Sequence, residues 1–274
     1  MRTSQAPHLC IDEIPSRLSA TTVMEGEMSR RGTASGLWGT ATHQGHLRTR
    51  NEDAILVEPD LGLYAVLDGM GGAAAGDVAS NLAARTLAAF VRENLGTQEL
   101  RLYDLLEAAL NAAAIAVHDL ATDSTEHRGM GTTVVACLIG PARQVSIAHA
   151  GDSRAYVLRD QRMRQLTRDH TISQQYIDEG RPLSPEAHAI YKTVVTRNLG
   201  QERGVAPDLI EERLEVGDRL LLCSDGLNDA LPDEAIQQIL SSRDAPSHIA
   251  RRLLEAALTG PCRDNVSVLV LDLE

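Results

Sequence analysis

Short apolar runs bounded by turn residues recur along the chain, and longer stretches with helical spacing separate them. The run 63–67 stops abruptly at Asp68 and is followed by glycines, which predicts a buried strand ending in a tight turn. Further strands are expected at 37–42, 54–57, 131–139, 145–150, 155–159, 163–166, 219–223 and 266–271, and helices at 74–95, 100–121, 233–240 and 247–258. Neighbouring strands followed by paired helices predict an α+β fold of antiparallel sheets with helices packed outside.

The domain organisation follows from where this periodicity begins and where it weakens. Residues 1–36 lack periodicity and are expected to form a flexible N-terminal extension. Residues 37–274 are expected to form one large domain, because the 274-residue chain can bury a full core. The more polar segment 171–200 contains Pro182 and Pro185 and predicts short helices and loops.

Composition and charge exclude several classes of function. The formal net charge of −12 argues against nucleic acid as the main partner. No apolar run approaches the ~20 residues of a membrane helix, and the N-terminus lacks the apolar region of a secretory signal, so no membrane insertion is expected. The four cysteines show no paired spacing, which favours the reducing cytoplasm.

Acidic residues stand at the ends of apolar strands in five places, usually beside glycine. One such acid alone is commonly a turn former or a helix cap. Five together predict an edge where carboxylates converge, and these would repel one another without cations. All-oxygen ligands favour Mg²⁺ or Mn²⁺, whereas Zn²⁺ would call for His and Cys at ligand spacing. The acids are Glu52 with Asp53, then Asp68, Asp152, Asp225 and Asp264.

A phosphate group fits such a site, because two ions about 3.5–4 Å apart can clamp a phosphoryl group and activate a water. Arg48, just ahead of Glu52, offers a planar fork for phosphate oxygens. Arg50 is the rival candidate, and either arginine could instead pair with a surface acid. Arg154 is expected to anchor Asp152 or a neighbouring loop, and Lys192 to be solvated.

Six short motifs occur in the order seen in type 2C protein phosphatases, the metal-dependent PPM family. The chain resembles the bacterial stand-alone branch of that family over residues 37–274. This resemblance implies a four-layer αββα sandwich of two antiparallel sheets flanked by helices, with 171–200 as a flap beside the active site. The motifs are Arg48-x-x-Asn51-Glu52-Asp53, Asp68-Gly69-Met70-Gly71-Gly72, Gly131-Thr132-Thr133, Gly151-Asp152-Ser153-Arg154, Ser224-Asp225-Gly226 and Asp264-Asn265.

The resemblance also implies roles for individual residues on one side of the site. Asp68 resembles the aspartate that bridges two metal ions and is central to catalysis, and the Gly69 carbonyl resembles a second-metal ligand. Glu52 matches an acid on the second metal's side, and Asp53 matches its outer partner. Arg48 matches the arginine that binds the substrate phosphate.

On the other side of the site, Asp225 and Asp264 match the acids of the first metal. Asp152 matches the acid that, with Asp225, holds a third and weaker ion in bacterial members. Met70 stands where animal relatives have a histidine proposed as general acid, so that step has no residue assigned to it. The implied cofactors are two Mn²⁺ or Mg²⁺ ions, with a third weaker one.

The resemblance implies hydrolysis of phosphoserine and phosphothreonine by direct attack of a metal-bound water. The expected partners are phosphoprotein substrates, namely a bacterial Ser/Thr kinase and the targets whose phosphorylation the enzyme reverses. Two alternatives remain open. One is a catalytically inactive domain that binds phosphoproteins, and the other is a phosphatase of an anti-sigma-factor antagonist.

Overall fold

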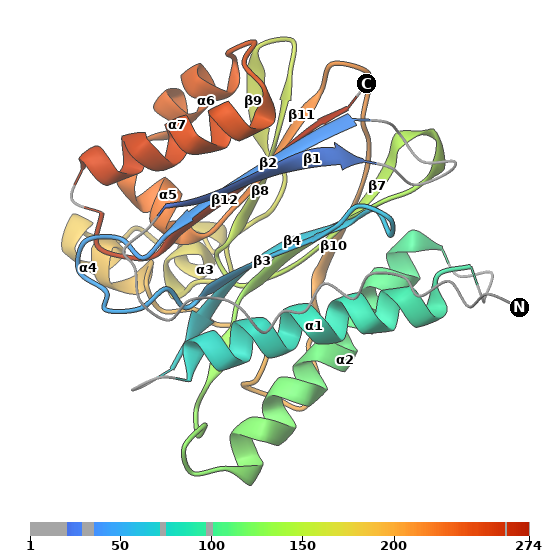
Figure 1. Ribbon diagram of the computed structural model, residues 1–274. Helices are drawn as coiled ribbons and strands as arrows, with labels where there is room; N and C mark the ends of the chain where they lie inside the picture. The colour runs from blue at the N-terminus through green and yellow to red at the C-terminus, as the bar shows by residue number, and fades with distance from the viewer. Residues whose placement is uncertain (1–20, 29–35, 72–74, 97–100, 261, 274) are drawn as a thin grey trace, which may run out of the picture.

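The computed structural model describes residues 21–28, 36–71, 75–96, 101–260 and 262–273, and its strands form two stacked antiparallel sheets (Figure 1). The first sheet has the order β1 (Thr22–Met28), β2 (Gly36–His43), β12 (Val266–Leu273), β11 (Arg219–Cys223), β8 (Arg154–Arg159) and β9 (Arg162–Gln165). The second has the order β10 (Asp208–Arg213), β7 (Gln144–Ala150), β6 (Val134–Ile139), β4 (Leu63–Met70) and β3 (Asp53–Glu58). A two-residue strand, β5 (Gly131–Thr132), also pairs with β4.

Helices cover the outer face of each sheet, so the αββα sandwich expected from the sequence is confirmed (Figure 1). The second sheet is covered by α1 (Gly76–Asn94) and α2 (Leu102–Asp123). The first sheet is covered by α5 (Asp225–Ala230), α6 (Asp233–Leu240) and α7 (Pro246–Thr259). The flap segment holds α3 (Ile172–Asp178) and α4 (Pro185–Tyr191), and a 3₁₀ turn at Pro141–Arg143 precedes β7.

The alternation of side chains along β4 explains how one strand serves two interfaces. Leu63, Ala65 and Leu67 face the layer of α1 and α2, while Tyr64 and Val66 face the other sheet. Successive side chains of a strand point to opposite faces, so a continuous apolar run is what a strand covered on both sides requires. All five residues are fully buried. This packing fixes where β4 ends, and therefore where Asp68 lies.

The helix predicted at 100–121 is α2, and it is more apolar than the sequence pattern suggested. With 22 residues and a mean hydropathy of 1.2, it is long and apolar enough to cross a membrane. In the fold it packs against α1 and against β7 and β6 of the second sheet, as a core helix does. Eight of its residues are buried, mostly alanines and leucines at helical spacing.

Two strands escaped prediction, and both lie at sheet edges with mostly half-buried or exposed side chains. The expectation of a flexible extension over 1–36 is wrong for Thr22–Met28, which forms β1 and pairs with β2 in continuous register. The rest of that extension, apart from residue 21 and Gly36, lies outside the described residues. Strand β10, at the edge of the second sheet, mixes half-buried and exposed residues, and its three acids and one arginine leave no clear apolar pattern in the sequence.

Candidate metal and phosphate site

The predicted acids gather at one end of the sandwich, and β3 and β4 supply the first pair. Asp53 begins β3 and Asp68 lies near the end of β4, and the register places the two residues opposite each other. The Ser224 hydroxyl, from the other sheet, donates to Asp53 Oδ2 at 2.9 Å. The other oxygen, Asp53 Oδ1, is buried and has no hydrogen-bond partner among the described residues. Asp53 is thus held from one side and left unsatisfied on the other.

The glycines after Asp68 permit a close approach of three chain segments. A Cβ at Gly69 would lie 2.1 Å from the Gly76 carbonyl oxygen and 2.5 Å from that of Glu52. A Cβ at Gly76 would in turn lie 2.8 Å from the Glu52 carboxyl carbon. The Gly69 N–H donates to the Glu52 carbonyl at 3.2 Å. Only glycine therefore fits where the end of β4, the start of α1 and Glu52 meet.

The first sheet supplies the opposing acids. Asp225 is the first residue of α5, directly after β11 and Ser224, and Asp264 precedes β12. Asp225 Oδ1 is buried and unpartnered among the described residues, like Asp53 Oδ1. Asp152 lies between β7 and β8, where the chain passes from one sheet to the other, and its side chain is buried.

Mutual repulsion in a desolvated setting raises the pKa of these carboxyl groups. Burial and then the charges of Asp53, Asp225 and Asp152 raise the pKa of Asp68 well above its ordinary value. Burial is also the main cause that raises the pKa of Asp53 to about 7, against hydrogen bonds from serines. For Asp225, burial and the charge of Asp264 raise the pKa to about 6. Each named neighbour is another predicted acid, so the sequence-predicted cluster is real in space.

Two further acids share this pattern at the edges of the cluster. Burial and the charge of Asp225 raise the pKa of Asp152. Burial and the charge of Asp77 raise the pKa of Glu52, while Arg48 and a hydrogen bond from the Gly76 N–H lower it. Unpaired buried carboxylates are costly, and bound cations remove that cost.

The donor set fits hard divalent cations that keep part of their water shell. Among the described residues, no three of these acids bring ligand atoms within 4.8 Å of one another; the group that does is His149, His170 and Asp208. Mg²⁺ and similar ions are commonly held by one or two carboxylates, with waters filling the other positions. Spread carboxylates with orphaned inner oxygens, on Asp53 and Asp225, suit that mode of binding.

Arg48 lies at the rim of the acid cluster. Its Nη2 is 2.6 Å from Asp264 Oδ2, and its side chain is 52% exposed. The hydrogen bond with Asp264 is the main cause that raises the pKa of Arg48, with further support from the charges of Glu52 and Asp68. Arg50, the rival candidate, is exposed, and its carbonyl accepts a hydrogen bond from Asn265.

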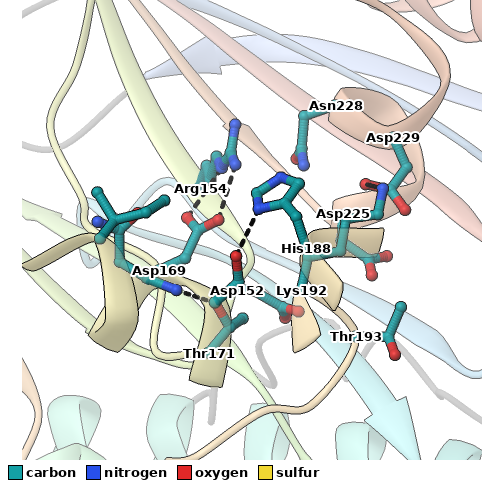
Figure 2. Close-up of a pocket in the computed structure, with 13 residues that line it drawn as sticks. Asp152, Arg154, Asp169, Thr171, His188, Lys192, Thr193, Asp225, Asn228 and Asp229 are labelled. Atoms are coloured by element: carbon teal, nitrogen blue, oxygen red, sulfur yellow. Dashed lines mark hydrogen bonds and ion pairs between the residues drawn. The ribbon is translucent and has the colours of Figure 1, made fainter. Parts of the chain in front are cut away.

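A small polar pocket opens between the flap and α5, beside Asp152 and Asp225 (Figure 2). Lys192 on the flap is solvent-accessible, as expected, and also donates to Asp229 Oδ1 at 2.9 Å. Arg154 makes a two-pronged bond to Asp169, at 2.8 and 2.7 Å, so its role in anchoring a neighbouring loop is confirmed.

Three residues without a role predicted from the sequence hold the acids in place. Asn265 accepts from the Glu52 N–H at 2.8 Å and donates to the carbonyls of Gln44 and Arg50. The Ser224 hydroxyl links Asp53 to the Ser267 N–H. The Thr133 hydroxyl accepts from the Asp68 N–H at 3.2 Å and bonds to Ser153 at 2.7 Å. The sequence motifs contained Asn265, Ser224 and Thr133, but only the fold shows their partners.

Comparison with known proteins places this site in a family. A family model for protein phosphatase 2C matches residues 42–257. The serine/threonine protein phosphatase PstP of Mycobacterium tuberculosis is 39% identical over 237 residues, which is 86% of this chain and 44% of PstP. The chain thus spans less than half the length of that relative. The serine/threonine phosphatase stp of Listeria innocua is 34% identical over 84% of this chain and 93% of its own.

A solved structure supports the same assignment. The catalytic domain of a serine/threonine protein phosphatase PstP, in complex with two manganese ions, has a TM-score of 0.76 and 36% identity, covering 92% of this chain and 99% of that domain. The chain therefore belongs to the protein phosphatase 2C family of serine/threonine phosphatases. Its fold is that of the bacterial catalytic domains.

Proposed function

We propose that this protein hydrolyses phosphoserine and phosphothreonine in phosphoproteins, in the cytoplasm, and reverses the action of a bacterial Ser/Thr kinase. The proposed cofactors are two Mn²⁺ or Mg²⁺ ions, with a third and weaker one. The observation that carries this proposal is the set of half-buried acids whose inner oxygens, on Asp53 and Asp225, lack partners among the described residues. Such a set is unstable alone and suited to cations.

The residues have separate tasks in the proposed reaction. Asp68 and the Gly69 carbonyl, together with Glu52, would hold one ion, with Asp53 supporting them from behind. Asp68, Asp225 and Asp264 would hold the other. When bound, the ions would activate a water as nucleophile and neutralise charge on the phosphoryl group.

Arg48 would bind the phosphate. It now donates one hydrogen bond, from Nη2 to Asp264 Oδ2, and its half-exposed guanidinium carries further N–H groups that can donate to phosphate oxygens. Binding by Arg48 would orient the phosphorus toward the acid cluster, which lowers the entropic part of the barrier.

The weaker third ion would be held by Asp152 and Asp225, which line the pocket beneath the flap. This pocket is polar and is bordered by Lys192 and Asp229, and we propose that the flap beside it contacts the substrate. The proposed substrates are therefore phosphorylated segments of proteins rather than small metabolites.

The test is hydrolysis of p-nitrophenyl phosphate, and then of matched phosphoserine, phosphothreonine and phosphotyrosine peptides. Each is measured in EDTA, Mg²⁺ and Mn²⁺. We expect activity only with a divalent ion, loss in Asp68→Ala, and preference for phosphoserine and phosphothreonine. Asp123→Asn, an exposed change at the end of α2, is the matched control and should leave activity unchanged. Folded wild-type protein that is inactive with every ion would favour a phosphoprotein-binding module instead.

A further inference from the structure

His170 lies where both ends of the flap meet the loop that carries Asp152. Its backbone N–H donates to the Gly151 carbonyl at 2.8 Å, and its ring Nδ1 accepts from the Gly151 N–H at 3.1 Å. Its carbonyl accepts from the Thr196 N–H at 2.8 Å, at the far end of the two flap helices. One buried residue thus bonds to the loop before Asp152 and closes the base of the flap.

The hydrogen bonds determine the tautomer of His170. Since Nδ1 accepts from Gly151, the neutral ring carries its proton on Nε2. Nε2 lies 3.2 Å from Asp208 Oδ2, and Asp208 also takes Arg197 Nη1 at 2.6 Å. Burial lowers the pKa of His170, which is consistent with a neutral ring. The chain of contacts runs from Asp208 through His170 to Gly151.

The same side chains do not favour a metal site of their own. Ligand atoms of His149, His170 and Asp208 lie within 4.8 Å of one another. A metal on His170 Nε2 would move the ring proton to Nδ1, where it would face the Gly151 N–H. Arg197 Nη1 lies 3.0 Å from Nε2; in this tautomer both groups are donors to the Asp208 carboxylate, and the guanidinium supplies the positive charge beside Nε2. The buried His149 ring stacks on His170, with centroids 4.4 Å apart.

Gly151 has little freedom to move between its neighbours. Its φ is +119°, and a Cβ would lie 2.5 Å from the Thr133 side chain. The Thr133 hydroxyl in turn bonds to Ser153, the residue after Asp152. Thr133 therefore supports the turn from one side, and His170 supports it from the other.

We propose that His170 is a positioning residue that sets the direction of the Asp152 carboxylate and couples it to the closure of the flap. This inference rests on the proposed function for the role of Asp152 as a ligand of the weak third ion. Movement of the flap base would displace His170 and, through the hydrogen bonds between them, Gly151. Conversely, an ion held by Asp152 would stabilise the closed flap base, because the hydrogen bonds of His170 support both the loop that carries Asp152 and the base of the flap.

The test uses three substitutions at His170 that separate its bonds. His170→Ala removes the acceptor for Gly151 and the donor to Asp208. His170→Asn places an amide oxygen near the position of Nδ1 and should keep the Gly151 bond. His170→Gln places its amide near Nε2 and should not. Arg181→Ala, an exposed flap change outside the pocket beside Asp152 that removes an ion pair to Glu179, is the matched control.

The first readout is Mn²⁺ binding, which is monitored through the electron paramagnetic resonance signal of free Mn²⁺. Substituting the partner of a ligand typically weakens metal binding about 10–100-fold. In His170→Ala and His170→Gln we expect the weakest Mn²⁺ step to weaken by at least about tenfold, with the tighter steps unchanged. His170→Asn and Arg181→Ala should bind like the wild type.

The second readout is hydrogen exchange of flap peptides in EDTA, which needs neither metal nor activity. We expect faster exchange at the flap base in His170→Ala and recovery in His170→Asn. If the wild-type protein binds no Mn²⁺, the proposed function is contradicted and this inference is not. Hydrogen exchange would then still test the coupling between His170 and the flap. Equal binding and exchange in His170→Ala and wild type, or an equal defect in His170→Asn, would overturn the inference. Asp208→Ala, on the exposed edge strand, replaces His170→Ala if that variant does not fold.

Discussion

Asp225→Asn should stabilise the metal-free protein at neutral pH, although it removes a proposed metal ligand. Burial and the charges of Asp264 and Asp229 raise the pKa of Asp225 from 3.8 to about 6 in the folded protein. The folded state therefore binds this proton more tightly than the unfolded state does. The destabilisation is absent below pH 4, grows between about pH 4 and 6, and is complete above that range.

The size of the effect follows from the pKa difference. A shift of one pKa unit corresponds to about 1.4 kcal/mol, so the rise from 3.8 to about 6 corresponds to about 3 kcal/mol. For a protein of this length, each kcal/mol moves the midpoint of thermal unfolding by about 2–4 °C. Asparagine has nearly the same shape as aspartate, so packing costs should be small beside this term.

The assay is thermal unfolding in EDTA at about pH 4.5 and 7.5, monitored by circular dichroism. We expect Asp225→Asn to equal the wild type at the lower pH and to unfold up to about 10 °C higher at the upper pH. The exposed Asp123→Asn variant controls for the loss of one negative charge. With saturating Mn²⁺ the order should reverse, because the wild type gains more from binding. A variant no more stable than wild type in EDTA at pH 7.5 would refute the reasoning.

Three further substitutions separate binding, backbone fit and packing. Arg48→Lys, assayed by steady-state kinetics, should lower kcat/KM about 10–100-fold with unchanged Mn²⁺ affinity, because lysine loses the planar fork. Gly69→Ala should destabilise the fold by at least about 1–3 kcal/mol in urea unfolding, since its Cβ would lie 2.1 Å from the Gly76 carbonyl oxygen. Leu87→Ala, at a fully buried position on α1, should cost about 2–5 kcal/mol in the same assay and leave metal dependence unchanged.

Hydrophobic patterning was sufficient to predict the strands that are buried on both faces and the helices that bury one apolar stripe. The helix predicted at 233–240 is α6, with the same bounds. The predicted strands at 155–159 and 163–166 are joined by a hairpin turn at Asp160 and Gln161, whose φ values are both positive. Strands β1 and β10 could not be found this way. Their stability comes from pairing with β2 and β7, and their side chains are half exposed and polar.

The site was predictable as a set of acids and not as a network. Acids at strand ends have a sequence signature, since an apolar run that stops at Asp-Gly is visible in one dimension. The partners that hold them have none. Asn265 reaches Glu52 across more than two hundred residues, and His170 meets Gly151 only because the flap folds back. Such contacts depend on tertiary packing, about which the periodicity of the sequence carries no information.

The position of the acids links the stability of the sandwich to its chemistry. Asp53 and Asp68 belong to one sheet, while Asp225 and Asp264 belong to strand ends of the other. Burial and the charges of acids on both sheets raise the pKa of Asp68 at this end, where cross-sheet bonds such as Ser224 to Asp53 at 2.9 Å hold the sheets together. Cations bound between these acids would turn their mutual repulsion into attraction. Chelation should therefore loosen the end of the sandwich at the site before the apolar interior between the sheets, because burial at that interior does not depend on charge.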